Sequence, residues 1–69
     1  MVEYLELDLA ETQQIYQAVQ LMKLKPVDIE YQEKCSTLVF VIDNQHYGLV
    51  YDRECDWFLD IAYKITDWG

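Results

Sequence analysis

The sequence contains few of the residues that build loops, metal sites and phosphate-binding sites. Its 69 residues include two glycines, one proline, one histidine and two cysteines. Loops that cradle phosphate need several glycines in a short stretch, so both common forms of that motif are excluded. No apolar run approaches the roughly 18 residues of a membrane span. The sequence therefore indicates neither a nucleotide-binding loop nor a membrane protein.

Basic residues are also scarce. Five Lys and Arg stand against thirteen Asp and Glu, which gives a formal net charge of -8. Such a charge repels phosphate backbones and favours association with basic surfaces, so we predict no direct binding to nucleic acid. The same charge is also a common way to keep a small aromatic-rich domain in solution.

Cys35 and Cys55 are the two cysteines, and the first residues, MVEYLELDLAE, have neither the basic region nor the continuous apolar region of a secretion signal. Two cysteines in such a context usually remain reduced thiols in a cytosolic protein, although a disulfide would form if the fold brought them together. The sequence therefore predicts a cytoplasmic protein.

The length allows one domain over residues 1–69, and a chain this short buries only about 60% of the surface that its unfolded form exposes. At 52% hydrophobic and 14% aromatic residues, the composition is that of a chain that folds. We predict a single small acidic α+β domain.

A first helix is predicted over Leu9–Leu24. Asp8 followed by Glu11 fits a capping box at its start, and Pro26 closes it. Its apolar residues recur at helical spacing, and they are Ile15, Tyr16, Val19 and Met22. The residues before it, Met1–Leu7, alternate weakly and fit either an extra short strand or an extended lead-in.

A three-stranded antiparallel meander is predicted to follow. Val27–Glu33 alternates strictly, a loop covers Lys34–Ser36, and Thr37–Tyr51 forms a hairpin that turns at Asn44 and Gln45. Because directly opposed residues share a face, this register gives one common apolar face, made of Val27, Ile29, Tyr31, Leu38, Phe40, Ile42, Tyr47, Leu49 and Tyr51. The other face carries Asp28, Glu30, Gln32, Thr37, Val39, Val41, Gly48 and Val50.

A second helix is predicted from about Arg53 to Thr66, with Asp52 as its cap. Its apolar stripe would be Phe58, Ile61, Ala62 and Ile65. The predicted fold is therefore α+β in the order helix, three-stranded antiparallel meander, helix (αβββα), with both helices on the apolar face of the sheet.

The residues with catalytic or metal-binding potential do not form a recognisable pattern. His46 has no nucleophile at a supporting spacing, and the carboxylates show no defined pairing. Cys35, His46 and Cys55 are 11 and 9 residues apart, unlike a compact zinc motif. We predict a protein that is not an enzyme and that holds no metal and no cofactor.

Two surfaces are candidates for binding a partner. On the predicted second helix, one line combines acidic and aromatic residues: Asp56, Asp60, Tyr63 and Asp67, with Trp57 and Trp68 beside them. The second surface is the sheet face on which Asp28 and Glu30 border a patch formed by Val39, Val41 and Val50. These valines need cover from the chain itself, from a second copy or from a target.

These features together predict a non-catalytic acidic protein-binding module. The preferred hypothesis is an inhibitor that occupies a basic surface of a larger protein, such as its nucleic-acid site, in the manner of DNA mimics and of phage proteins that block host defence. The alternatives are an immunity protein or antitoxin against a basic toxin, and a structural homodimer joined through the valine face or a sheet edge.

Overall fold

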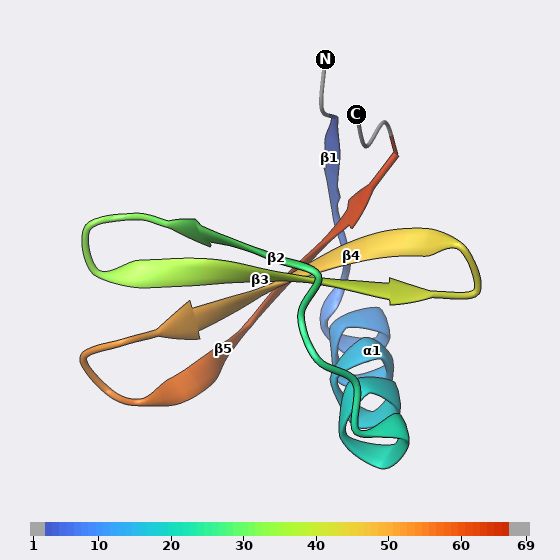
Figure 1. Cartoon of the computed structure of the whole chain (residues 1–69), viewed down its shortest axis with the longest axis horizontal. Coiled ribbons are helices and arrows are strands. Elements are labelled where there is room, and N and C mark those ends of the chain that lie inside the picture. Colours follow the sequence, from blue (N-terminus) through green and yellow to red (C-terminus); the bar gives the residue numbers. More distant parts are fainter. Residues whose placement is uncertain (1–2, 67–69) are drawn as a thin grey trace.

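The protein is a single twisted antiparallel sheet with one helix packed on it. The computed structural model describes residues 3–66. Its elements are β1 (Tyr4–Glu6), α1 (Leu9–Met22), β2 (Asp28–Tyr31), β3 (Cys35–Ile42), β4 (Gln45–Asp52) and β5 (Trp57–Ile65). The strands lie in the order β1-β5-β4-β3-β2, so β1 and β2 form the two edges of the sheet (Figure 1).

Helix α1 begins where the capping pattern predicts. The Asp8 carboxylate accepts a hydrogen bond from the Glu11 amide at 2.8 Å, which satisfies one of the free amides of the first turn. The helix ends at Met22, because Lys23 adopts a left-handed conformation with φ 52° and its amide bonds back to carbonyls of the last turn. The first predicted helix is confirmed, and it stops two residues before the predicted end.

The hairpin of β3 and β4 exists, but its predicted turn is wrong by one residue. The turn residues are Asp43 and Asn44, with φ of 50° and 64°, and Ile42 pairs with Gln45. Positive φ at both central residues is typical of the tight turns that match the twist of a hairpin, and Asn and Asp tolerate it best after glycine. The pairing therefore shifts by two residues, so that Phe40 faces Tyr47, and an even shift leaves the face of every side chain unchanged.

The second predicted helix is wrong. Residues 57–65 form β5, a central strand that pairs with β4 on one side and with β1 on the other. The supposed helical stripe is split by the sheet, since Ala62 packs in the core with α1 while Ile61 lines a cavity on the opposite face. The stretch has helical spacing, but it also alternates apolar residues at 57, 59, 61, 63 and 65. Hydrogen bonds to neighbouring strands on both sides favour the strand.

Residues before the helix form the edge strand β1. Tyr4 pairs with Ile65 and Glu6 pairs with Tyr63, so the beginning of the described chain lies beside its end (Figure 1). The extra short N-terminal strand is therefore present, and the predicted three-stranded meander is part of a five-stranded sheet. The αβββα arrangement is corrected to one helix with five antiparallel strands.

The core lies between α1 and one face of the sheet. Its buried members are Val19, Phe40, Leu49 and Ala62, and Leu7, Ile15, Leu24, Leu38, Ile42 and Phe58 pack around them. A helix about 10 Å wide covers roughly two strands spaced about 4.8 Å apart, and α1 lies on β4 and β5. The edge strand β2 is left uncovered, so Tyr31, predicted on the apolar face, is 71% exposed.

Two of the three valines of the patch on the other face are covered by the chain itself. Val39 is 1% exposed and Val50 is 7% exposed. Gly48 faces Val39 across the hairpin, and the absence of a side chain there lets Thr37 and Ile65 approach the backbone. Val39 and Val50 are therefore part of the interior, whereas Val41 is half-buried, and a homodimer stays a prediction.

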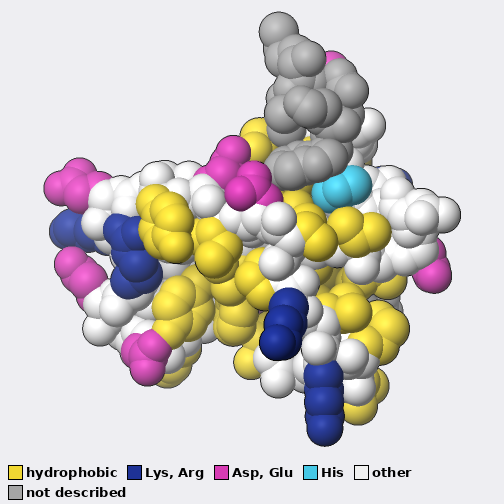
Figure 2. Space-filling view, in the orientation of Figure 1, with side chains coloured by type: hydrophobic (Ala, Val, Ile, Leu, Met, Phe, Trp, Pro, Cys, Tyr) yellow, Lys and Arg dark blue, Asp and Glu magenta, His cyan; other side chains and the backbone are white. Residues whose placement is uncertain are grey.

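Arg53 connects the β4–β5 turn to the β2–β3 turn at one end of the sheet. Its guanidinium donates hydrogen bonds to the carbonyls of Gln32 and Glu33 and to the Ser36 hydroxyl, and it lies 5.6 Å from the centre of the Tyr31 ring. In Figure 2, basic side chains gather at the end where these turns lie, next to acidic ones. Within residues 3–66, no helix is long and apolar enough to cross a membrane.

Candidate functional site

The face of the sheet turned away from α1 carries the candidate site, and we call it the cavity face. Alternation along the paired strands places one set of side chains there, which includes Tyr4, Glu6, Asp28, Glu30, Cys35, Thr37, Val39, Val41, His46, Gly48, Val50, Tyr63 and Ile65. The charged residues among them are all acidic, whereas Lys64 lies on the helix side of β5 opposite Tyr47.

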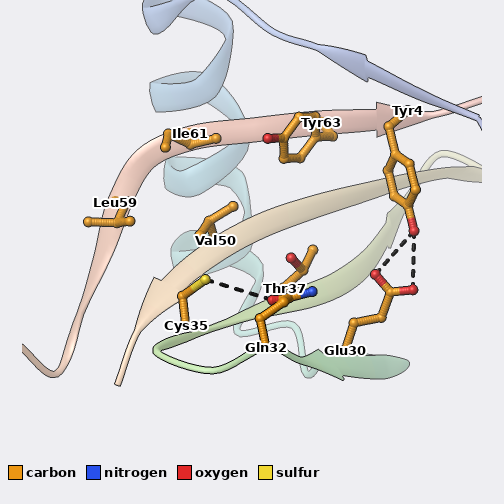
Figure 3. A pocket seen from close by; sticks show the side chains of 9 residues that line it. All are labelled: Tyr4, Glu30, Gln32, Cys35, Thr37, Val50, Leu59, Ile61 and Tyr63. Carbon is orange, nitrogen blue, oxygen red and sulfur yellow. Dashed lines mark hydrogen bonds between the residues drawn. The ribbon is translucent and has the colours of Figure 1, made fainter. Parts of the chain in front are cut away.

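The two edges of the sheet meet across this face. The Tyr4 hydroxyl, on β1, lies 3.2 Å and 3.1 Å from the two carboxylate oxygens of Glu30, on β2, and donates to them (Figure 3). These strands are separated by three others in the sheet, so the contact requires the sheet to curl strongly over the cavity face. The hydrogen bonds close one side of the hollow that this curl creates.

The hollow is a cavity of about 500 Å³. Val50, Leu59 and Ile61 form an apolar wall, and Tyr63 extends it toward Tyr4 (Figure 3). The remaining lining residues carry polar groups, and they are Glu30, Gln32, Cys35 and Thr37. An apolar wall with a few converging polar groups, within the ~300–1,000 Å³ typical of ligand sites, is the usual character of a binding cavity.

Strand β5 contains an irregularity beside the cavity. Leu49 pairs with Ala62 and Tyr51 with Phe58, so β5 uses four residue steps where β4 uses two. The additional residues lie opposite Val50, and because their number is even, alternation along β5 still places Leu59 and Ile61 on the same face as Tyr63.

Tyr4 and Glu30 form an electrostatically coupled pair. Desolvation raises the pKa of the Tyr4 hydroxyl above 10.0, and the hydrogen bond and charge of Glu30 raise it further, with a smaller contribution from Asp28. The hydroxyl therefore remains protonated at neutral pH and donates to the Glu30 side chain. Two contacts from one hydroxyl leave further acceptor positions on the Glu30 carboxylate.

The acidic line predicted on the second helix does not exist as one surface. Asp56 occupies the β4–β5 turn with φ 59° and accepts a hydrogen bond from the Tyr51 hydroxyl. Asp60 and Trp57 line a separate cavity of about 260 Å³ beside α1, whereas Tyr63 lies on the cavity face. Asp67 and Trp68 lie outside the described residues.

Part of the second predicted surface lies at the cavity. Asp28 and Glu30 lie on the cavity face, as the strand alternation predicts, and the curl of the sheet brings Glu30 to the same cavity as Tyr63. Tyr4, Leu59 and Ile61 were not predicted at this site. The apolar alternation through residues 57–65 could have placed Leu59 and Ile61 on the same face as Tyr63.

The cysteines and the histidine are dispersed. Cys35 lies half-buried at the cavity, where its thiol is 3.7 Å from the Gln32 side-chain oxygen, and Cys55 is exposed; both are free thiols. The charge of Asp52 is the main cause that raises the pKa of the Cys55 thiol. His46 pairs with Val41 across the hairpin. Within residues 3–66, no three His, Cys, Asp or Glu side chains are grouped to hold a metal ion.

No protein-family model, curated protein or solved structure matches this chain. The cavity face must therefore be interpreted from its own geometry and charge.

Proposed function

We propose that the protein is an acidic binding module that places its cavity face on a basic surface of a larger protein. The observation that carries this proposal is the combination of an apolar, aromatic cavity with acidic residues from both edges of the sheet. Glu6 comes from β1, and Asp28 and Glu30 come from β2. Among the described strand residues, no Lys or Arg lies on this face.

The charge of the whole chain supports the same kind of partner. Within residues 3–66, every Asp and Glu except Asp52 is exposed. A net charge of -8 accelerates encounter with a basic surface and disfavours nucleic acid and other acidic proteins. Affinity at the centre of an interface comes mainly from aromatic and apolar anchors, which the cavity supplies.

The proposal is for binding and not for catalysis. The titratable groups at the cavity are Tyr4, Glu30, Cys35 and Tyr63, and the first two are hydrogen-bonded to each other. By occupying a basic surface the module would inhibit whatever that surface does. The hypothesis of a DNA mimic rested on the net charge, on the lack of catalytic residues and on an acidic line along a second helix, and because that helix is a strand, DNA mimicry is not part of the proposal. A cytoplasmic location stays part of the proposal, supported by the two free thiols.

Capture from a host lysate, followed by measurements with the purified partner, tests the proposal. We expect salt-sensitive binding, which the double variant Asp28→Asn, Glu30→Gln weakens. Both substitutions keep the oxygen atoms that accept from the Ile29 amide and the Tyr4 hydroxyl.

The matched control is Glu33→Gln, Glu54→Gln, which removes the same charge from two exposed turn residues. Equal weakening by both pairs would mean that only net charge matters, and binding that is unaffected by either pair would reject the cavity face as the contact. Rescue of growth from a toxin that proves to be the partner would identify an antitoxin.

A further inference from the structure

We infer that the cavity receives a single arginine side chain from the partner. This rests on the proposed function and specifies its central contact. The stem of the arginine lies against Val50, Leu59 and Ile61, and the guanidinium binds Glu30 beside the rings of Tyr4 and Tyr63.

The apolar wall suits the stem. Long basic side chains carry three or four methylene groups that pack on apolar surface while the charged end remains at a polar rim. The cavity has this layout, because its aliphatic residues come from β4 and β5 and its carboxylate comes from the edge strand β2 (Figure 3). A volume of about 500 Å³ admits such a side chain together with part of its backbone.

The rim suits the guanidinium. Within residues 3–66, the contacts of the Glu30 carboxylate are the two from Tyr4, and no lysine or arginine forms a salt bridge with it. The rings of Tyr4 and Tyr63 lie with centroids 5.9 Å apart and planes at 74°, so they present an edge and a face to the same corner. A planar guanidinium binds a carboxylate through two parallel hydrogen bonds and stacks on an aromatic face, which an ammonium group does less well.

Other occupants fit the cavity less well than an arginine side chain. An anionic ligand would meet Glu30 with Asp28 nearby on the same strand and face. A neutral apolar ligand would fill the wall without using the carboxylate. A second copy of the chain would bring its own acidic surface toward this one.

Methyl and amide NMR titration of the full chain tests the inference without a known partner. The probes are N-acetylarginine amide, the neutral isostere N-acetylcitrulline amide, and N-acetylnorleucine amide. We expect the arginine probe to shift Val50, Leu59 and Ile61 with a dissociation constant of about 1–10 mM, as befits so small a ligand. The citrulline and norleucine probes should bind several-fold more weakly.

Two variants separate the charge from the cavity. Glu30→Gln keeps the acceptor for Tyr4 and should weaken the arginine probe about three- to tenfold, while Glu33→Gln, on the exposed turn, should leave it unchanged. Ile61→Trp fills the cavity without altering charge and should abolish the shifts. The amide spectrum of each variant verifies its fold.

Several outcomes would overturn the inference. Equal binding of the arginine and citrulline probes would show a neutral apolar site, and shifts that depend on protein concentration without any probe would show that a second copy occupies the cavity. Absence of binding by the wild-type protein at tens of millimolar arginine probe would show that the cavity does not receive this side chain. In each case the partner capture described above could still succeed, so failure of the inference is distinct from failure of the proposed function.

Discussion

Substituting Gly48 by alanine should destabilise the protein, although the opposite is expected of a glycine in a strand. An added Cβ at position 48 would lie 2.9 Å from the Thr37 Cγ2 atom and 3.9 Å from the Ile65 Cδ1 atom. The first distance is too short for two carbon atoms, and Thr37 is a buried, branched residue that cannot swing away. The prediction therefore tests the packing of the cavity face directly.

The magnitude follows from two opposing terms. Crowding a well-packed interior costs about 1–3 kcal/mol, whereas replacing a strand glycine by alanine gains roughly 0.5–1 kcal/mol. From the middle of each range, we expect Gly48→Ala to lower the free energy of unfolding by about 1 kcal/mol. In a domain of this size that corresponds to a fall in melting temperature of about 4–8 °C for each kcal/mol.

A double-mutant cycle identifies the cause. Thr37→Ser removes the Cγ2 atom and keeps the hydroxyl, so the alanine should cost less in that background than in the wild type, with a coupling energy of about 1 kcal/mol. Urea unfolding followed by far-ultraviolet circular dichroism gives the four free energies, provided that the dependence on urea stays constant. A Gly48→Ala protein as stable as the wild type, or strictly additive effects in the cycle, would refute the reasoning.

Three further predictions concern a cap, a turn and the cavity rim. Asp8→Ala should cost about 1 kcal/mol in urea unfolding, because the Glu11 amide loses its acceptor; no change would mean that the cap contributes nothing. Asn44→Gly should stabilise the protein by about 0.5 kcal/mol, since glycine adopts φ 64° without steric cost, and a destabilised variant would contradict the assigned turn. The raised pKa of Tyr4 means that the folded state holds this proton more tightly than the unfolded state. Its contribution to stability is present below pH 10.0 and is lost as the pH rises through the raised value, so Tyr4→Phe should remove part of the alkaline destabilisation. In wild-type protein, NMR titration of the Tyr4 ring should report a pKa above 10.0 that moves toward 10.0 in Glu30→Gln, and an unmoved pKa would show that desolvation alone causes the shift.

The first helix and the faces of the hairpin could be predicted because each depends on neighbouring residues. The Asp8 cap acts within one turn, and the alternation of Leu38, Phe40 and Ile42 survives any even shift of register. The tight turn at Asp43 and Asn44 was also within reach, because Asp and Asn tolerate positive φ better than Gln45 does. The predicted turn lies one residue later. This error shifts the strand pairing by two residues, so it leaves the predicted faces unchanged.

The last strand could not be settled by spacing. Residues 57–65 satisfy a helical stripe and a strand alternation at the same time, and β5 exists because β4 and the edge strand β1 offer it hydrogen bonds on both sides. Because the predicted second helix does not form, the acidic line predicted along it does not form either. Asp56 lies in a turn, Asp60 lies on the helix side of the sheet, and Tyr63 lies on the cavity face.

The charge of the protein, the start of α1 and the shared faces of β2, β3 and β4 follow from composition and from local periodicity. The completion of the sheet by β1 and β5, and the curl that brings Tyr4 to Glu30, depend on contacts between residues far apart in the chain. Those two residues are 26 positions apart and lie on opposite edges, so no local pattern relates them. Pairing and twist, which depend on the whole sheet, create the cavity where we place the function.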